Sequence, residues 1–268
     1  MNAKTPSLFP DQEPAAHKPS ASEPAAPLAA PRCRWMAFDI EIENVFESAP
    51  GEDIDKYGPF DISVAAMATD TGEVKHWFEK DATGQPGGHL SPIKAREMLE
   101  YLRAAQRAGV RVCAWNGLSF DLRWLGHAAG DFALAGEVAL ELYAPMFQFV
   151  AQRGFPVALA NVAEGLGIEM KKLMHGADAP KRWAAGEHQL VLDYVAGDCR
   201  ITALVVERIE KQREIRWRTK KGTVSSEPMR TLLTVREAMK LPLPDTSWMS
   251  EPLKREKFHA WLKPLAPL

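Results

Sequence analysis

The stretch RWMAFDIEIE, residues 34–43, decides the fold class of this chain. One set of alternate positions carries large apolar side chains: Met36, Phe38, Ile40 and Ile42. The other set holds Trp35, Ala37, Asp39 and Glu41. A period of two predicts a β-strand, and the apolar flank on both sides of the acids favours a central strand of a sheet.

Asp39 and Glu41 lie two residues apart, so both side chains point to the same face of this strand. Their Cα atoms are about 6.6 Å apart at the usual rise of a strand. Two carboxylates at that spacing repel each other unless a cation lies between them. In isolation the pair is equally well explained by a solvated strand face. Glu43 points the same way but lies about 13 Å from Asp39, and we leave it out of the cluster.

A second acidic element is WNGLSFDLRWL, residues 115–125. The preceding run VRVCAW predicts a strand, Asn116-Gly117 predicts a turn, and Ser119 is a candidate cap for a helix that begins near Phe120. Asp121 then falls in the first helical turn. Polar residues at the carboxyl end of a strand suit a ligand site in an α/β sheet. An acid at this position alone is also explained by the helix dipole.

A third element is DYVAGDCRIT, residues 193–202, within a long amphipathic helix predicted for residues 187–213. Tyr194 and Asp198 are four residues apart and share one helical face. Asp193 lies about 140° round the helix from Asp198 and points elsewhere. Taken alone, Asp198 is also explained as a surface aspartate on an amphipathic helix.

The remaining pattern predicts an α/β protein with a mixed sheet, three antiparallel strands followed by parallel strands, flanked by helices. Strands are expected at residues 61–69, 74–79, 110–115 and 138–142. Helices are expected at residues 91–108, from just after residue 142 to about residue 152, at 157–165 and at 254–262. A hairpin is expected around residues 220–222. In the first helix Ile93, Met98, Leu99 and Leu102 are expected to form a buried stripe.

Three regions differ in composition. Residues 1–31 are rich in Ala, Pro and Ser, which predicts a disordered tail. Residues 32–213 form the expected domain, and residues 214–268 form an extension with a basic hairpin and a helix. Either tail is a candidate for binding a protein partner, the C-terminal one through LPLPDTSWM, residues 241–249.

Bulk properties narrow the function classes. The chain has 268 residues with a formal net charge of −2, which argues against a protein that holds nucleic acid along its whole surface. An acidic metal site on a nucleic-acid enzyme remains compatible with that charge. Three separated cysteines predict a reducing, cytoplasmic compartment, and no stretch is apolar enough to span a membrane.

Asp39, Glu41, Asp121 and Asp198 arrive in order on a strand, a strand-to-helix turn and a late helix. In this the chain resembles the DnaQ-like 3′→5′ exonucleases of the ribonuclease-H-like fold, in the branch with a tyrosine four residues before the last aspartate. FDIEI, NGLSFDLRWL and YVAGD match the three motifs of that family, and NGLSFDLRWL is most similar to the proofreading domains of family B DNA polymerases. The resemblance covers about residues 33–210, including ANVAEGLGIEMKK between the Asp121 and Asp198 motifs.

The resemblance implies hydrolysis of phosphodiester bonds with two Mg²⁺ or Mn²⁺ ions. Asp39 would bridge both ions, Glu41 and Asp198 would complete the site whose ion activates water, and Asp121 would hold the second ion. Tyr194 would orient the water. The implied partner is a single-stranded 3′ end of nucleic acid, with DNA favoured over RNA.

Further residues are candidates for substrate contacts. Asn116 and Phe120 would reach the terminal nucleotides, although Phe120 also suits the core. Candidate phosphate contacts are Lys171, Lys172, Lys181, Arg182, Arg213, Arg216, Arg218, Lys220 and Lys221, with Trp217 between two of the arginines. The alternatives are a 3′→5′ exoribonuclease and a catalytically silent nucleic-acid-binding module. The presence of all four carboxylates and the tyrosine argues against the silent module.

Overall fold

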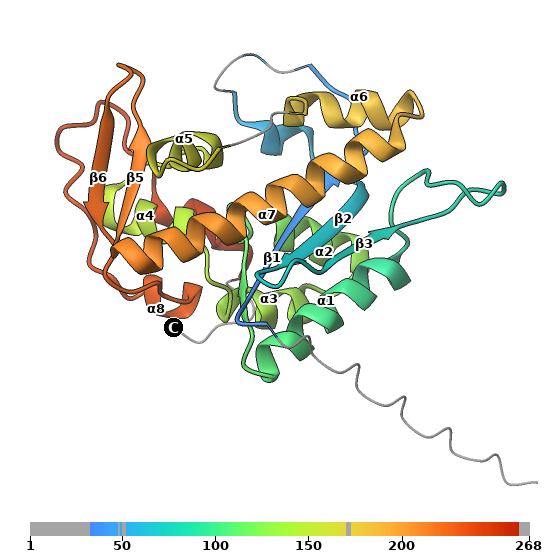
Figure 1. Cartoon of the computed structure of the whole chain (residues 1–268), viewed down its shortest axis with the longest axis horizontal. Coiled ribbons are helices and arrows are strands. Elements are labelled where there is room, and N and C mark those ends of the chain that lie inside the picture. Colours follow the sequence, from blue (N-terminus) through green and yellow to red (C-terminus); the bar gives the residue numbers. More distant parts are fainter. Residues whose placement is uncertain (1–32, 48, 50–51, 170–172, 263–268) are drawn as a thin grey trace, which may run out of the picture.

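The computed structural model describes residues 33–47, 49, 52–169 and 173–262. Its main sheet has the strand order β3-β2-β1-β4 (Figure 1). The strands are β1 (Trp35–Ile42), β2 (Ile62–Thr69), β3 (Val74–Phe78) and β4 (Arg111–Cys113). β2 is antiparallel to both β1 and β3, and β4 is parallel to β1. The predicted mixed sheet is confirmed, and this sheet is compatible with a ribonuclease-H-like fold. β1 is an inner strand of the sheet, between β2 and β4.

The two faces of β1 enter two separate hydrophobic cores. Met36, Phe38 and Ile40 pack towards α1, α2 and α3. Trp35 and Ala37 on the other face pack towards α7, which crosses the sheet in Figure 1. The helices are α1 (Pro92–Arg107), α2 (Asp121–Ala129), α3 (Phe132–Leu140) and α7 (His188–Gln212). β1 is therefore covered on both sides, which explains why it is so apolar before its two acids.

α1 begins as the sequence predicts. Ser91 caps it by accepting a hydrogen bond from the backbone of Lys94, and Pro92 takes the first helical position. Met98, Leu99 and Leu102 are fully buried, but the expectation for Ile93 is wrong, because this residue is 79% exposed. Ile93 lies five residues before Met98, about 140° away around the helix, so it faces solvent.

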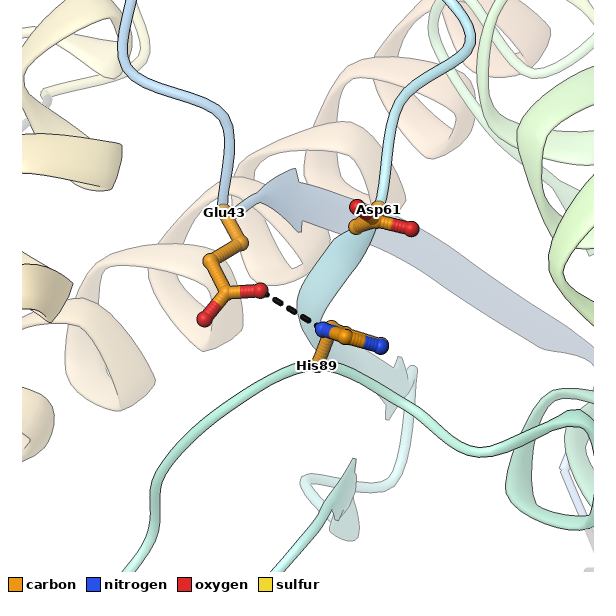
Figure 2. Close-up of side chains that lie close together, drawn as sticks. All are labelled: Glu43, Asp61 and His89. Carbon is orange, nitrogen blue, oxygen red and sulfur yellow. Dashed lines mark hydrogen bonds and ion pairs between the residues drawn. The ribbon is translucent and has the colours of Figure 1, made fainter.

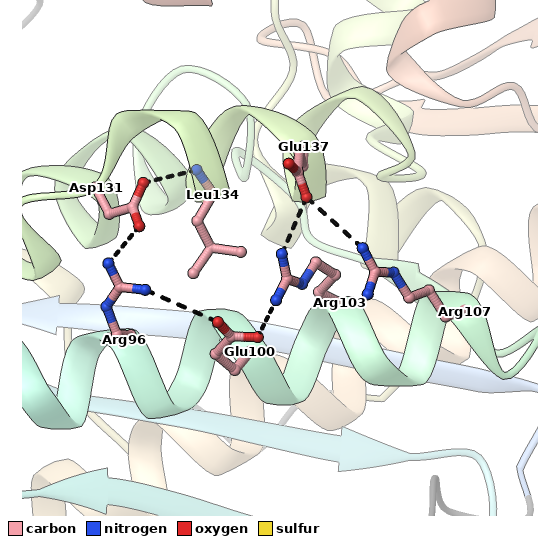
Figure 3. Close-up of polar contacts among 7 residues, drawn as sticks. All are labelled: Arg96, Glu100, Arg103, Arg107, Asp131, Leu134 and Glu137. Atoms are coloured by element: carbon pink, nitrogen blue, oxygen red, sulfur yellow. Dashed lines mark hydrogen bonds and ion pairs between the residues drawn. The ribbon is translucent and has the colours of Figure 1, made fainter. Parts of the chain in front are cut away.

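Ion pairs on the surface connect α1 to α3 (Figure 3). Arg96 pairs with Asp131 at 2.5 Å, and Arg103 pairs with Glu137 at 3.1 Å. Asp131 also caps α3 by accepting a hydrogen bond from the backbone of Leu134 at 2.9 Å. Exposed pairs of this kind each contribute at most about 1 kcal/mol, so they help to hold the two helices in register but do not drive their packing.

The strand expected at residues 138–142 is wrong. Residues 132–140 form α3, and the parallel strand reduces to one bridge between Cys113 and Tyr143. A short continuous apolar run has no periodicity that separates a buried helix from a buried strand. This run forms a helix because Asp131 caps its start and because Gly126, which has no side chain, lets Ala135 of α3 pack closely against α2.

The other elements surround this core. They are α4 (Pro145–Arg153), α5 (Leu159–Gly165), α6 (Ala179–Ala184), α8 (Val235–Ala238), and the 3₁₀ turns Ile54–Tyr57, Gly176–Asp178, Arg255–Phe258 and Ala260–Leu262. The single helix expected at residues 254–262 is divided in the structure into two 3₁₀ turns. Docking of side chains on the core overrides the local helical pattern: Leu262 is buried, and the Trp261 indole donates a hydrogen bond to the Leu118 carbonyl at 2.8 Å.

The predicted hairpin is confirmed as β5 (Glu214–Arg218) and β6 (Val224–Pro228), a separate two-stranded sheet. Ile215 at its base is buried in the core beneath α7. The tail predicted for residues 1–31 lies outside the described residues. Within the described part of the chain, no helix is long and apolar enough to cross a membrane.

Candidate metal centre

Three of the predicted carboxylates meet beneath α7. One oxygen each from Asp39, Glu41 and Asp198 lies within 4.8 Å of the other two. β1 supplies the first two, and the middle of α7 supplies the third. Next to Asp198, the Cys199 thiol donates to the Ala66 carbonyl of β2 at 3.3 Å, which fixes that turn of α7 on the sheet. The three groups could hold a metal ion.

Asp121 lies beside the same cluster and contacts Asp39. It is the first residue of α2 and is only 2% exposed. Its carboxyl group shares a hydrogen bond with that of Asp39, and its Oδ1 atom has no partner among the described atoms. The turn before α2 requires Gly117, because a Cβ there would lie 2.6 Å from Ala114 and 2.7 Å from Leu142.

Burial and mutual repulsion make these carboxyl groups hard to ionise. Burial raises the pKa of Asp39 well above its usual range, and the charges of Asp121, Glu41 and Asp198 raise it further. Burial, then Asp198 and Asp121, raises the pKa of Glu41 in the same way. Burial also raises the pKa of Asp121 to about 6. Within the described residues, no ion pair joins any of the four carboxylates to a basic side chain.

Tyr194 stands one helical turn before Asp198 and donates a hydrogen bond to its carboxylate. Burial and the nearby carboxylates raise the pKa of Tyr194, so its hydroxyl keeps its proton. Asp193 is exposed and accepts a hydrogen bond from Gln189, so it points away from the cluster as expected. Gly176 lies against Tyr194, since a Cβ there would be 3.2 Å from the hydroxyl.

Two clefts open beside the cluster. Glu41 and Phe120 line one cleft of about 290 Å³, with Lys181 at its edge. Tyr194 and Asp198 line another of about 270 Å³. The clefts are adjacent, because both include Gly176 and because the carboxylates of Glu41 and Asp198 lie within 4.8 Å of each other. The cluster is thus reachable from solvent on two sides.

The predicted substrate residues divide into three groups. Phe120 lines the first cleft while also packing on Phe60 at 5.9 Å, so both of its expected roles have a structural basis. Asn116 lines neither cleft, and its amide oxygen accepts a hydrogen bond from Ser119. The expectation that Ser119 caps α2 is wrong, because Phe120 takes the cap position without a side-chain bond. Lys171 and Lys172 lie outside the described residues.

Sequence reasoning missed two residues at the clefts. Gly176 in the run HGAD and Phe46 after β1 both lie in the lining of the first cleft. A glycine between a histidine and an alanine has no pattern of its own that links it to Tyr194. Phe46 carried a weak signal, because it is a large apolar residue in a loop otherwise rich in polar residues.

A separate metal-like group lies at the end of the β1–β2 ladder and consists of Glu43, Asp61 and His89 (Figure 2). His89 Nδ1 is 2.8 Å from a carboxylate oxygen of Glu43. All three side chains are partly or fully exposed. The hydrogen bond to His89 accounts for this arrangement, and we do not include it in the candidate centre.

No protein-family model and no curated protein matches this chain. Among solved structures, its fold is similar to that of the family B DNA polymerase from the hyperthermophilic archaeon Pyrobaculum calidifontis. The match has a TM-score of 0.46 and 19% sequence identity, and it covers 67% of this chain. It covers 25% of the polymerase, so the chain spans about a quarter of that protein's length.

Proposed function

We propose that this chain is a metal-dependent exonuclease that removes nucleotides from the 3′ end of a nucleic-acid strand, with DNA as the favoured substrate. One observation carries the proposal: the carboxylates of Asp39, Glu41 and Asp198 converge within 4.8 Å, with Asp121 hydrogen bonded to Asp39. The direction of attack, from the 3′ end, rests on the resemblance of the three motifs.

The residues fit divalent metal ions on chemical grounds. Four carboxyl groups with raised pKa values have no basic partner among the described residues, and Asp121 Oδ1 is buried without a hydrogen bond. Such an arrangement is costly unless a cation neutralises it. The donors are all oxygens, which favours Mg²⁺ or Mn²⁺ over a metal that prefers nitrogen or sulphur.

Each side chain then has a role that follows from its place. Asp39 contacts both halves of the cluster and would bridge two ions, Glu41 and Asp198 would complete one site, and Asp121 would hold the other ion. The bound ions would stabilise negative charge on the phosphodiester and lower the pKa of a bound water.

Tyr194 and the cleft residues would position the substrate and the water. The Tyr194 hydroxyl keeps its proton and lies beside Asp198, so it can hold a water near that carboxylate. Phe120 offers a ring face to a terminal base in a cleft large enough for one nucleobase, and Lys181 offers a charge to its phosphate. A small cleft next to the carboxylates suits a strand end better than the middle of a duplex.

The direct test compares 3′-labelled and 5′-labelled single-stranded DNA and RNA of one sequence, with Mg²⁺, Mn²⁺ or EDTA. The proposal predicts that a 3′ label is released as mononucleotide at once, whereas a 5′ label shortens stepwise. EDTA and the Asp39→Asn variant should both stop the reaction. Faster digestion of RNA would reassign the enzyme as an exoribonuclease. Tight binding of both strands without hydrolysis in any metal would support the silent binding module instead.

A further inference from the structure

The hairpin formed by β5 and β6 is the most basic part of the described chain. Residues 213–230 contain six basic and two acidic side chains, although the whole chain has a formal net charge of −2. Lys220 and Lys221 stand at its tip, and both are exposed. Within the described residues neither lysine has an ion-pair partner, so their charges are free to meet an external anion.

The strand pairing sends the basic and apolar side chains to opposite faces. Ile215 and Trp217 point inward, where the Trp217 ring meets the Phe149 ring at 5.1 Å. Arg216 and Arg218 alternate with them and point outward, opposite Ser226 and Val224 of β6. Trp217 is partly buried against the core and faces away from Arg216 and Arg218, so the expectation that it lies with them along a nucleic-acid backbone is wrong. The outward face of this two-stranded ribbon carries both arginines, each of them ion-paired with a glutamate.

α5 connects this ribbon to the metal centre. Leu159 and Ala160 at its start line the cleft that holds Tyr194 and Asp198. Gly165 at its end touches the hairpin so closely that a Cβ would lie 2.5 Å from Trp217 Cα. Figure 1 shows α5 lying between α7 and the hairpin, with the hairpin tip rising beside it. α5 thus lines the cleft at its start and contacts the hairpin at its end.

The distance along this surface sets a length of nucleic acid. α5 is about 10 Å long, and the three residues from Trp217 to Lys220 add about 10 Å. At the roughly 3.4 Å per nucleotide of a stacked strand, some 20 Å corresponds to at most about six nucleotides, and an extended strand covers it with fewer. A mononucleotide in the cleft would end before the tip, whereas a 20-nucleotide strand would extend past it.

We propose that the β5–β6 hairpin binds the phosphate backbone of the substrate strand, within about six nucleotides of the 3′ end being cut. This inference rests on the proposed function for the identity of the strand. The arginines on the ribbon face pair with Glu214 and Glu164 at 2.5 and 3.5 Å, so Lys220 and Lys221 at the tip carry the contact. The hairpin contributes to substrate affinity and not to the hydrolysis step, because the length of α5 separates it from the carboxylates.

The test uses Lys220→Glu combined with Lys221→Glu in the full chain. A matched control is Lys80→Glu combined with Lys240→Glu, which changes the net charge equally at two exposed lysines outside the hairpin. For the hairpin variant, kcat/KM on a 20-nucleotide single strand should fall about 10-fold, and its dependence on salt should weaken. Its kcat/KM on the p-nitrophenyl ester of thymidine 5′-monophosphate, which is too short to reach the hairpin, should stay at the wild-type value, and the control should match wild type throughout.

Equilibrium binding separates this proposal from the proposed function. Fluorescence anisotropy of the labelled 20-nucleotide strand, with Ca²⁺ in place of Mg²⁺, should show weaker binding by the hairpin variant than by wild type and control. That result supports the hairpin contact even if no phosphodiester is hydrolysed. Equal binding by all three proteins would overturn it and would leave an acidic protein as the partner of this face. An equal loss on the 20-nucleotide strand and on the nitrophenyl ester would overturn it as well.

Discussion

Asp39 in the middle of β1 shares a hydrogen bond with Asp121, the first residue of α2, through their carboxyl groups. Two acids can be this close only when one of them holds a proton or a cation lies beside them. In the metal-free protein, burial and the neighbouring acids raise the pKa of Asp39, which favours the first solution. The proposed enzyme takes the other solution, so occupancy of the centre should couple to both activity and stability.

Asp39→Asn should abolish hydrolysis while the fold is retained. The substitution keeps the shape of the side chain but removes a ligand that would bridge two ions, so several kcal/mol of charge stabilisation is lost. At 1.36 kcal/mol per factor of ten, the rate should fall on the order of 10³-fold or more. The measurement is release of a 3′ label with Mg²⁺, accompanied by a far-ultraviolet circular dichroism spectrum. A folded Asp39→Asn protein with wild-type nuclease activity would refute the assignment of the centre.

Tyr194→Phe should slow hydrolysis much less than the loss of a carboxylate. The hydroxyl contributes one hydrogen bond, worth about 0.5–1.5 kcal/mol, so kcat should fall about 10-fold at most. KM should change little, because Phe keeps the ring in the cleft. Steady-state kinetics on a short DNA strand provide the measurement, with Asp39→Asn as the reference for full inactivation. A Tyr194→Phe variant as inactive as that reference would show that the hydroxyl does more than orient water.

The metal-free protein should lose stability as the pH rises through the titration of Asp121. Its pKa is about 6 in the folded protein, above the ordinary value of 3.8 for an unfolded chain. The folded state therefore binds protons more tightly, and this contribution to stability is complete below about pH 4 and lost as the pH passes 6.

In EDTA, Asp121→Asn should raise the melting temperature relative to wild type by more at pH 7 than at pH 5. Asparagine cannot ionise, so the repulsion that grows with pH is absent in the variant. Saturating Mn²⁺ should raise the melting temperature of wild type at pH 7 and that of the variant by less, because the variant keeps the Asp39, Glu41 and Asp198 group but loses the ligand of the other ion. A wild-type advantage in EDTA that grows between pH 5 and pH 7 would contradict the raised pKa.

Gly117→Ala should destabilise the protein because its methyl group would overlap Ala114 and Leu142. Overpacking of this kind costs about 1–3 kcal/mol, and each kcal/mol lowers the melting temperature by about 2–4 °C in a chain of this size. Gly197→Ala is a matched control in α7, where a Cβ meets nothing within 4 Å. That control should be neutral or slightly stabilising, since alanine favours a helix. Thermal unfolding of both variants in EDTA tests the difference.

Much of the fold could be predicted because its strongest patterns are local. The alternation in residues 34–43 is a property of neighbouring side chains, and so is the apolar stripe of α7, with Val191, Val195 and Ile209 fully buried. Ser91 and Pro92 likewise mark the start of α1 within two residues. These signals survive because the tertiary structure agrees with them.

The wrong predictions arose where the local pattern had two solutions. Residues 138–142 are almost entirely apolar, and only the packing of α3 on α2 selects the helix. Ile93 resembles a core residue until the phase of α1 is set by Met98 and Leu99. At residues 254–262, the packing of Trp261 and Leu262 on the core determines that the backbone forms two 3₁₀ turns.

By itself, the sequence determined which chemical groups are available and in what order: an acid pair on a strand, an acid after a turn, and a tyrosine and an acid on one helical face. Spacing within one strand or one helix also determined that Asp39 and Glu41, or Tyr194 and Asp198, share a face. Only the tertiary structure decided that Asp198 reaches within 4.8 Å of β1, that Asp121 faces Asp39, and that Gly176 lies against Tyr194. The reason is physical: side-chain direction repeats along a strand or helix, but distance between elements depends on how their buried faces pack.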